Sequence, residues 1–145
     1  MKVLLITPTA LDRHGQPIRK PRVFLPGLTL PMLAAVTPPE VEVTLHHDTI
    51  KEVPYDKQWD LVGITGMGSG IVGAWAIADR FRDRGVPVVI GGVAATLLGP
   101  ESSLAHADAV VLGDAVDTWP RVLDDWASGC LQDCYPSPGP PDIVD

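Results

Sequence analysis

The sequence has only two cysteines among its 145 residues, and it lacks any long uninterrupted hydrophobic run. Cys130 and Cys134 lie four positions apart, which excludes the cysteine framework of a small disulfide-rich secreted domain. No window reaches the roughly 18 consecutive apolar residues of a membrane-spanning helix, because glycine, threonine, aspartate and proline interrupt each candidate. The apolar residues 1–8 lack the hydrophobic length and the cleavage site of a signal peptide. We therefore expect a cytoplasmic protein with no membrane partner.

Positive charge is also scarce. The chain has 11 Lys and Arg residues against 18 Asp and Glu residues, and its formal net charge is −7. Such a surface repels phosphate backbones, so we expect no nucleic-acid partner. The hydrophobic content of 46% at this length fits one globular domain with one core.

Short apolar segments bounded by turn residues predict five β-strands, at residues 3–6, 41–45, 61–64, 86–90 and 109–112. Helices are predicted at residues 28–36, 71–85, 100–106 and 118–128. Strands that alternate with helices indicate right-handed parallel crossovers. We therefore predict an α/β fold of the doubly wound, flavodoxin-like or Rossmann-like kind. Its five-stranded parallel sheet has the order 2-1-3-4-5, with helices on both faces and a ligand crevice beyond the carboxyl ends of strands one and three.

The composition changes after Gly129, where residues 136–141 read Pro-Ser-Pro-Gly-Pro-Pro. Such a segment does not continue a helix or a sheet. We expect one domain at residues 1–130, followed by a flexible tail or truncated interdomain linker at residues 131–145.

The first strand is followed by an unusually long segment, residues 8–27. It holds four of the 11 cations, namely Arg13, Arg19, Lys20 and Arg22. Ordering a loop of this length costs backbone entropy that a bound ligand can offset. The segment is therefore either a binding element for a large anionic or amide-rich ligand, or a solvated mobile loop.

Small residues follow three of the predicted strands. The third strand runs into Gly-Ile-Thr-Gly-Met-Gly-Ser-Gly-Ile-Val-Gly at residues 63–73, the fourth into Gly91-Gly92, and the fifth into Gly113-Asp114. Glycines at such positions either let a ligand approach the backbone or pack a helix tightly on the sheet. Since the carboxyl ends of parallel strands share one edge, two adjacent gaps favour a ligand slot.

Residues 68–73 also match the glycine spacing of the dinucleotide-binding fingerprint. That fingerprint opens the first βαβ unit and needs an acidic residue about 20 positions later. This chain has no carboxylate there, at residues 88–92. The match is therefore weak.

Five segments in this order resemble the cobalamin-binding domain that precedes the catalytic barrel of cobalamin-dependent radical S-adenosylmethionine proteins. They are residues 2–8, 25–38, 60–65, 88–92 and 107–114, and the resemblance covers roughly residues 1–130. It implies that cobalamin binds base-off at the strand ends, with the corrin over them and the dimethylbenzimidazole tail in the slot. It also implies a radical S-adenosylmethionine catalytic domain or subunit as partner, and methyl transfer as the reaction.

The same resemblance implies a set of cofactor-binding residues. Thr65 would hydrogen-bond the tail, Gly91 and Gly92 would contact the nucleotide loop, and Asp114 would help to close the far wall. The complete set is Thr7, Pro26, Gly27, Leu28, Thr65, Gly66, Met67, Ser69, Gly91, Gly92, Val93, Gly113 and Asp114.

His14 occupies the place of a cobalt ligand found in other cobalamin domains. Cobalamin mutases carry Asp-x-His-x-x-Gly after the first strand, and the neutral imidazole binds cobalt. Here the segment is Asp12-Arg13-His14-Gly15-Gln16-Pro17, without the final glycine. His14 is either a cobalt ligand or a solvated loop histidine, and radical members of the family commonly lack this ligand.

The cysteines do not complete a cluster motif. Radical S-adenosylmethionine enzymes hold a [4Fe-4S] cluster with Cys-x-x-x-Cys-x-x-Cys. Cys130 and Cys134 match its first two positions, but the third is Ser137. We therefore expect no iron-sulfur cluster in this chain.

Other functional classes fit less well. A nucleotide- or flavin-binding module of the same fold is the main alternative. A signalling receiver needs an acceptor aspartate at the end of the third strand, where this chain has Thr65. No nucleophile with a base and no closed metal set appears, so the chain holds no complete active site.

Overall fold

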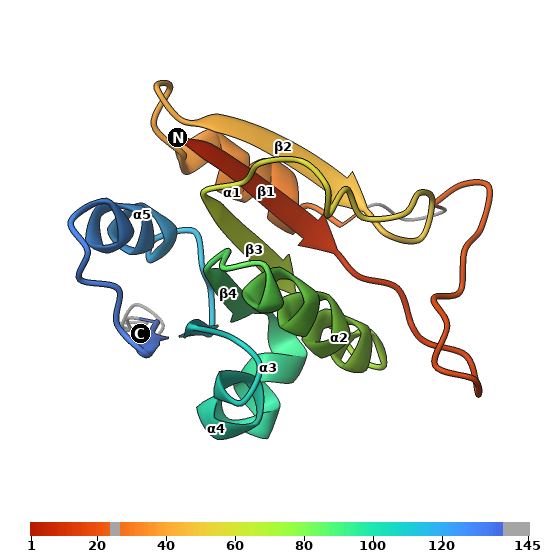
Figure 1. The fold of residues 1–145 in the computed structure, drawn as a ribbon. Coiled ribbons are helices and arrows are strands. Elements are labelled where there is room, and N and C mark those ends of the chain that lie inside the picture. Colours follow the sequence, from red (N-terminus) through yellow and green to blue (C-terminus); the bar gives the residue numbers. More distant parts are fainter. Residues whose placement is uncertain (24–26, 138–145) are drawn as a thin grey trace, which may run out of the picture.

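In the computed structural model, residues 1–23 and 27–137 are described, and they form a parallel sheet with helices on both faces (Figure 1). The strand order is β2-β1-β3-β4-β5-β6, and each neighbouring pair is parallel. The predicted fold class and the order 2-1-3-4-5 are confirmed. The strands are β1 Lys2–Thr7, β2 Glu42–His47, β3 Leu61–Thr65, β4 Val88–Gly91, β5 Ala109–Leu112 and β6 Cys134–Pro136.

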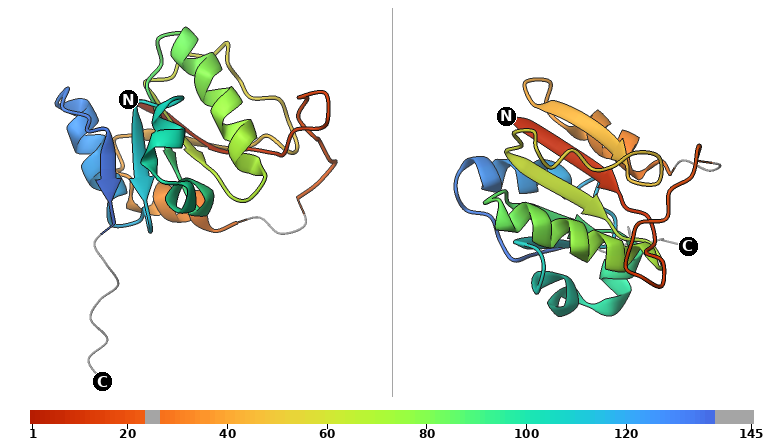
Figure 2. Two further views of the ribbon diagram at one scale, coloured as in Figure 1. Left: turned by 90° about the horizontal axis from the view of Figure 1, so that it is seen from below. Right: turned by 45° about the vertical axis from the view of Figure 1, so that its right-hand side comes forward.

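Two layers of helices cover the sheet (Figure 2). The helices are α1 Thr29–Val36, α2 Gly70–Asp83, α3 Val93–Leu98, α4 Pro100–Leu104 and α5 Trp119–Ala127. Side chains of α2, α3 and α4 pack against one face of the sheet, and those of α1 and α5 pack against the other. Because successive strand residues point to opposite faces, Val62 and Ile64 belong to the first core and Leu61 to the second. None of the helices in these two ranges combines the length and the hydropathy that spanning a bilayer requires.

The prediction of five strands is wrong by one. β6 extends the sheet beyond β5 within the segment that we expected to be a tail. Tyr135 is 1% exposed, and its hydroxyl donates a 2.8 Å hydrogen bond to Asp125 of α5. Pro136 is tolerated in β6 because this strand lies at the edge of the sheet, where the missing N–H of proline is not needed for a hydrogen bond to a neighbouring strand. The domain boundary at residue 130 stays a prediction, and residues 138–145 lie outside the described residues.

Helix α3 was not predicted. It begins directly after Gly92, whose φ is +103°, and it turns Ala94 and Ala95 toward the sheet. Six residues are too few for a helical hydrophobic period to emerge from the sequence. The chain after β4 therefore packs on the sheet through Ala94 and Ala95.

The long segment after β1 folds back on itself through residue 23. The hydroxyl of Thr9 donates to the carbonyl of Ile18 at 2.7 Å, and Leu11 forms an antiparallel bridge with Pro17. Arg19 then makes a 3.0 Å ion pair with Asp48, which is buried. The segment lies along α2, since a Cβ at Gly73 would overlap the carbonyl of Thr9.

Candidate functional site

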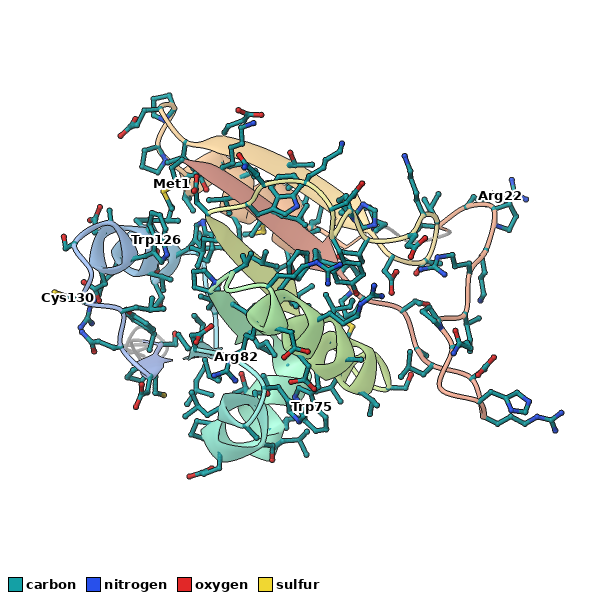
Figure 3. All side chains as sticks on the ribbon, viewed as in Figure 1. Met1, Arg22, Trp75, Arg82, Trp126 and Cys130 are labelled. Atoms are coloured by element: carbon teal, nitrogen blue, oxygen red, sulfur yellow. The ribbon has the colours of Figure 1, made fainter. Side chains whose placement is uncertain are left out.

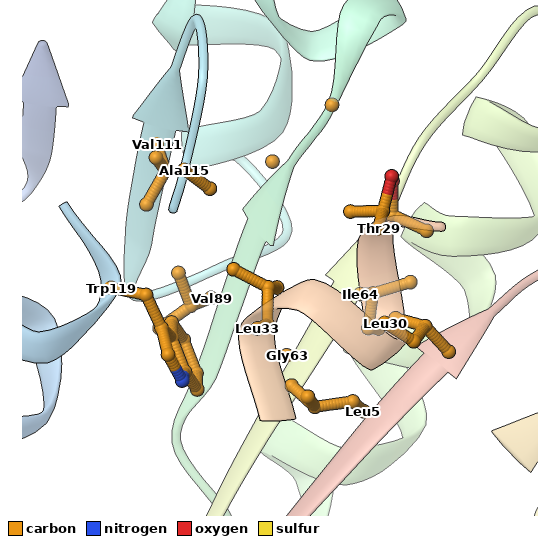
Figure 4. Close-up of a pocket in the computed structure, with 13 residues that line it drawn as sticks. Leu5, Thr29, Leu30, Leu33, Gly63, Ile64, Val89, Val111, Ala115 and Trp119 are labelled. Carbon is orange, nitrogen blue, oxygen red and sulfur yellow. The ribbon is translucent and has the colours of Figure 1, made fainter. Parts of the chain in front are cut away.

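A cleft lies between the sheet and the two helices α1 and α5 (Figure 4). Its cavity volume is small, about 30 Å³, close to the volume of a single water molecule. None of its lining residues is ionisable. They are Leu5, Thr29, Leu30, Leu33, Gly63, Ile64, Thr65, Val89, Gly91, Gly92, Val111, Ala115 and Trp119.

Gly63 makes the inner end of the cleft possible. This residue lies in the middle of β3, and a Cβ there would be 2.8 Å from Leu5 Cδ2 and 3.3 Å from Trp119 Cη2. The missing side chain therefore leaves room for the indole of Trp119 to lie over the sheet, as Figure 4 shows. The same face carries Val89 and Val111 from the next two strands.

The two helical walls are joined by a hydrogen bond. The indole Nε1 of Trp119 donates to the hydroxyl of Thr37 at 3.0 Å, and this hydroxyl donates to the carbonyl of Leu33 at 2.7 Å. Trp119 begins α5, whereas Leu33 and Thr37 belong to α1 and its carboxyl end. The two bonds thus join the start of α5 to the end of α1 at the inner end of the cleft.

The mouth of the cleft lies at the carboxyl edge of the sheet. Thr65 ends β3 and Gly91 ends β4, so both come from strand ends. A second, more open hollow of about 260 Å³ adjoins this mouth, and it shares Thr29, Gly92 and Ala115 with the cleft. Its remaining residues are Val93, Thr96, Leu97, Gly113 and Asp114.

Cleft and hollow together bring six of the predicted cofactor-binding residues into one region. Thr65, Gly91 and Gly92 line the cleft, and Val93, Gly113 and Asp114 line the hollow. The other described members of the set line neither space. They are Thr7, Gly27, Leu28, Gly66, Met67 and Ser69, and Pro26 lies outside the described residues.

The place of the cleft differs from the slot expected between the ends of the third and fourth strands. The turns after β3 and β4 contact each other directly, because Gly66 N donates to Gly91 O at 2.7 Å and Ala94 N donates to Gly66 O at 3.0 Å. A Cβ at Gly92 would be 2.6 Å from Gly66 O. These glycines serve backbone packing, and the space opens instead on the α1 and α5 face of the sheet.

Neither Met67 nor Val93 blocks the cleft. Their exposed fractions are 68% and 56%, so both side chains extend into solvent. A cleft filled by either residue would have been incompatible with a ligand slot at this edge.

His14 stands apart from the cleft. Its side chain is exposed and its Nε2 accepts a 3.2 Å hydrogen bond from Arg13 Nε, while its backbone N–H donates to Asp12. It does not line the cleft or the adjoining hollow. Across residues 1–23 and 27–137, no three His, Cys, Asp or Glu side chains lie close enough together to hold a metal ion.

The shifted pKa values belong to residues outside the cleft. Burial lowers the pKa of His46, and burial also raises the pKa values of Tyr55 and Tyr135. In the hollow, the Asp114 carboxylate accepts a 3.0 Å hydrogen bond from the backbone N–H of Val116. The cleft thus offers apolar contacts and hydroxyl groups, and it lacks an acid or base of its own.

The helical half of the site was not predicted from the sequence. Leu30, Leu33 and Trp119 supply the walls, together with Thr29 and Ala115 at the mouth. The available signal was the apolar face of each predicted helix, but that pattern does not tell which part of the sheet a helix covers.

Comparison with known proteins gives two methyltransferases of Chlorobaculum tepidum. The chain is 40% identical over 114 residues to bacteriochlorophyllide d C-8(2)-methyltransferase. These 114 residues are 76% of this chain and 24% of that protein. It is 33% identical over 110 residues to bacteriochlorophyllide d C-12(1)-methyltransferase, covering 74% of this chain and 24% of the relative. The chain therefore spans about a quarter of the length of these curated relatives. No protein-family model matches the chain, and no solved structure matches it.

Proposed function

We propose that this chain is a cobalamin-binding module that holds the cofactor base-off at the carboxyl edge of its sheet. The dimethylbenzimidazole tail enters the cleft between the sheet and helices α1 and α5. The corrin lies outside, above the strand ends. The observation that carries the proposal is an apolar, uncharged cleft whose mouth is built from three strand-end residues, Thr65, Gly91 and Gly92.

The chemistry of the cleft suits a flat, neutral heterocycle. The indole of Trp119 and the aliphatic side chains of Leu30 and Leu33 provide apolar contact area for a ring. The hydroxyls of Thr65 and Thr29 provide hydrogen-bonding groups where the polar part of the tail leaves the cleft. The lining residues include no cation for the doubly charged phosphate or pyrophosphate of a flavin nucleotide or dinucleotide, whereas the phosphodiester of a cobalamin tail carries a single charge. This difference disfavours the alternative of a nucleotide- or flavin-binding module.

Entry of a ring requires helix α1 to move away from the sheet. The inner end of the cleft is narrow because Leu5, Leu33 and Trp119 converge there (Figure 4). Helix α1 is held on the sheet by two buried side chains, Leu30 and Leu33, and by the half-buried Val36. The apolar area that moves away from these side chains is replaced by contact with the ring, so the hydrophobic cost of the movement is small.

The catalytic partner is a radical S-adenosylmethionine domain or subunit, and the reaction is methyl transfer. Both relatives are methyltransferases by name, and the chain matches about a quarter of their length. Bound cobalamin supplies a cobalt centre that carries a methyl group. The role of this chain is to bind the cofactor, to exclude water from its tail and to leave its upper face accessible.

Retention of cobalamin tests the proposal. Purified protein is mixed with hydroxocobalamin, with and without reduction, then desalted and examined by visible absorption. We expect a retained chromophore with a base-off spectrum. A protein that emerges colourless under both conditions overturns the proposal, and binding of a flavin or dinucleotide instead supports the alternative.

A pair of matched variants tests whether the cleft is the binding site. Ala115→Phe places a ring at the shared mouth of the cleft and the hollow, whereas Ala127→Phe places the same ring on the exposed side of α5. We expect the first variant to lose the chromophore and the second to keep it. Equal retention by both variants contradicts the assignment of the cleft.

A further inference from the structure

Thr96 of helix α3 connects two glycine turns at the mouth of the site. Its hydroxyl donates a 2.9 Å hydrogen bond to the carbonyl of Gly92, which lies at the start of its own helix. The same oxygen accepts a 2.9 Å hydrogen bond from the backbone N–H of Gly113, which follows β5. A hydroxyl has one donor and two acceptor positions, so one oxygen can make both bonds at once.

The two turns have special backbone conformations that a hydrogen bond can hold in place. Gly92 has a φ of +103° and Gly113 a φ of +72°, a region that glycine reaches without steric cost. Because glycine has no side chain to pack, such a turn is held only by its backbone contacts. Gly113 N–H has the Thr96 hydroxyl as its partner, and Thr96 therefore sets how far the turn after β5 lies from the turn after β4.

This distance defines the entrance to the candidate site. Gly92 lines both the cleft and the hollow, and Gly113 and Thr96 line the hollow. The Thr96 hydroxyl therefore joins two turns that both border this hollow. Neither the sequence motifs nor the resemblance assigned any role to Thr96.

We infer that Thr96 is a positioning residue that fixes the entrance of the cobalamin site by tying the turn at Gly113 to the turn at Gly92. The inference rests on the proposed function, since the ligand is the one assigned there. Thr96 does not need to touch the cofactor. It acts through the two backbone groups that it joins.

The effect on overall stability is small for a structural reason. Thr96 is exposed, so water replaces the lost partner of Gly113 N–H when the hydroxyl is removed. The Gly92 carbonyl keeps its backbone hydrogen bond from Thr96 N at 3.1 Å. Thr96→Val, which has the same shape, is therefore expected to fold and to change the entrance alone.

The experiment compares Thr96→Val with Thr96→Ser and Ser103→Ala. Thr96→Ser keeps the hydroxyl. Ser103→Ala removes the buried hydroxyl of Ser103 in helix α4, which accepts a 3.1 Å hydrogen bond from Nε1 of Trp75 (labelled in Figure 3). The dissociation constant for hydroxocobalamin is measured for each variant and for the unchanged protein. We expect Thr96→Val to raise it by roughly fivefold to tenfold, the ratio that one hydrogen bond corresponds to. Thr96→Ser and Ser103→Ala are expected to stay within about twofold of the unchanged protein.

A second measurement needs no cofactor. Amide hydrogen exchange at Gly113, followed by NMR in the cofactor-free protein, should become faster in Thr96→Val and stay unchanged in the other two variants. Unchanged exchange at Gly113 in Thr96→Val shows that the hydrogen bond between Gly113 N–H and the Thr96 hydroxyl does not exist. Faster exchange with an unaltered dissociation constant shows that the tie does not position the ligand. If the unchanged protein binds no cobalamin, the proposed function and the ligand role of Thr96 are both overturned, and the exchange result still decides whether the tie exists.

Discussion

Trp119 and Thr37 lie 82 positions apart, and the indole of the first donates a 3.0 Å hydrogen bond to the hydroxyl of the second. The bond joins the start of helix α5 to the end of helix α1, the two helices that wall the apolar cleft. Trp119 is buried and lies over the bare backbone of Gly63. The cleft thus depends on a contact between three elements that are distant in the chain.

Replacing Trp119 tests the hydrogen bond between helices α5 and α1. Trp119→Phe keeps a ring over Gly63 but removes the N–H, so the free energy of unfolding should fall by about 1–2 kcal/mol, from the lost hydrogen bond and a smaller ring. Urea denaturation gives the value. Trp126→Phe is the control on the same helix, because the Trp126 indole takes no part in the hydrogen bond between α5 and α1. Its free energy of unfolding should fall by less than that of Trp119→Phe. An equal loss in both variants would mean that the bond to Thr37 contributes nothing.

Gly63 is expected to tolerate no larger residue. Gly63→Ala brings a Cβ within 2.8 Å of Leu5 and 3.3 Å of Trp119, so both side chains must shift. We expect a loss of about 1–3 kcal/mol, the usual cost of overpacking a core, together with weaker cobalamin retention. Gly70→Ala is the control, since a Cβ there would come no closer than 3.6 Å to the atoms of Pro8. Thermal unfolding of the two variants separates them, and equal melting temperatures would contradict the packing argument.

Tyr135 is predicted to hold β6 on the sheet. Its hydroxyl donates to Asp125 at 2.8 Å and accepts from the backbone N–H of Gln132 at 2.9 Å. Tyr135→Phe leaves the ring in place and should reduce the free energy of unfolding by about 1–2 kcal/mol. Amide exchange at residues 133–135 and 137 should become faster while that of β1 and β3 is unaffected. Uniformly faster exchange across the sheet would instead indicate a global effect.

The stability of the protein should fall as the pH decreases below 6.5. Burial lowers the pKa of His46 from its ordinary value of 6.5, so the unfolded chain binds a proton more readily than the folded one. The full contribution of neutral His46 to the free energy of unfolding is present above pH 6.5. It is lost as the pH falls from 6.5 toward the lower pKa of His46 in the folded protein. His46→Gln should flatten this part of the curve of unfolding free energy against pH. A mutant curve that parallels that of the unchanged protein would remove His46 as the cause.

Secondary structure and strand order follow from local patterns along the chain. Buried apolar runs such as residues 61–64, and the glycine stop after the helix that ends near residue 83, need only nearby residues to be recognised. Alternation of strands and helices then leaves few sheet topologies. The carboxyl edge of the sheet was therefore predictable as the place of a candidate site, and six of the implied residues line the cleft or its hollow.

Strand β6 shows where such patterns end. A three-residue segment with a proline carries no periodic signal, and its stability comes from the contact of Tyr135 with Asp125, ten positions away. Helix α3 is similar, because two alanines and a glycine turn become a helix only where the sheet covers them. Short elements of this kind depend on packing more than on propensity.

Sequence by itself determined the order of elements and the glycine-rich strand ends, because hydrophobic period and turn chemistry act between neighbours in the chain. Only the tertiary structure decided what those glycines do. Gly66 and Gly92 bring two turns into contact, while Gly63, in mid-strand, leaves the space that Trp119 borders. The physical reason is distance along the chain. A glycine, and so a missing Cβ, can be read from the sequence. The side chain that fills the vacated volume comes from a distant element, and only the packing of the whole sheet determines which one it is.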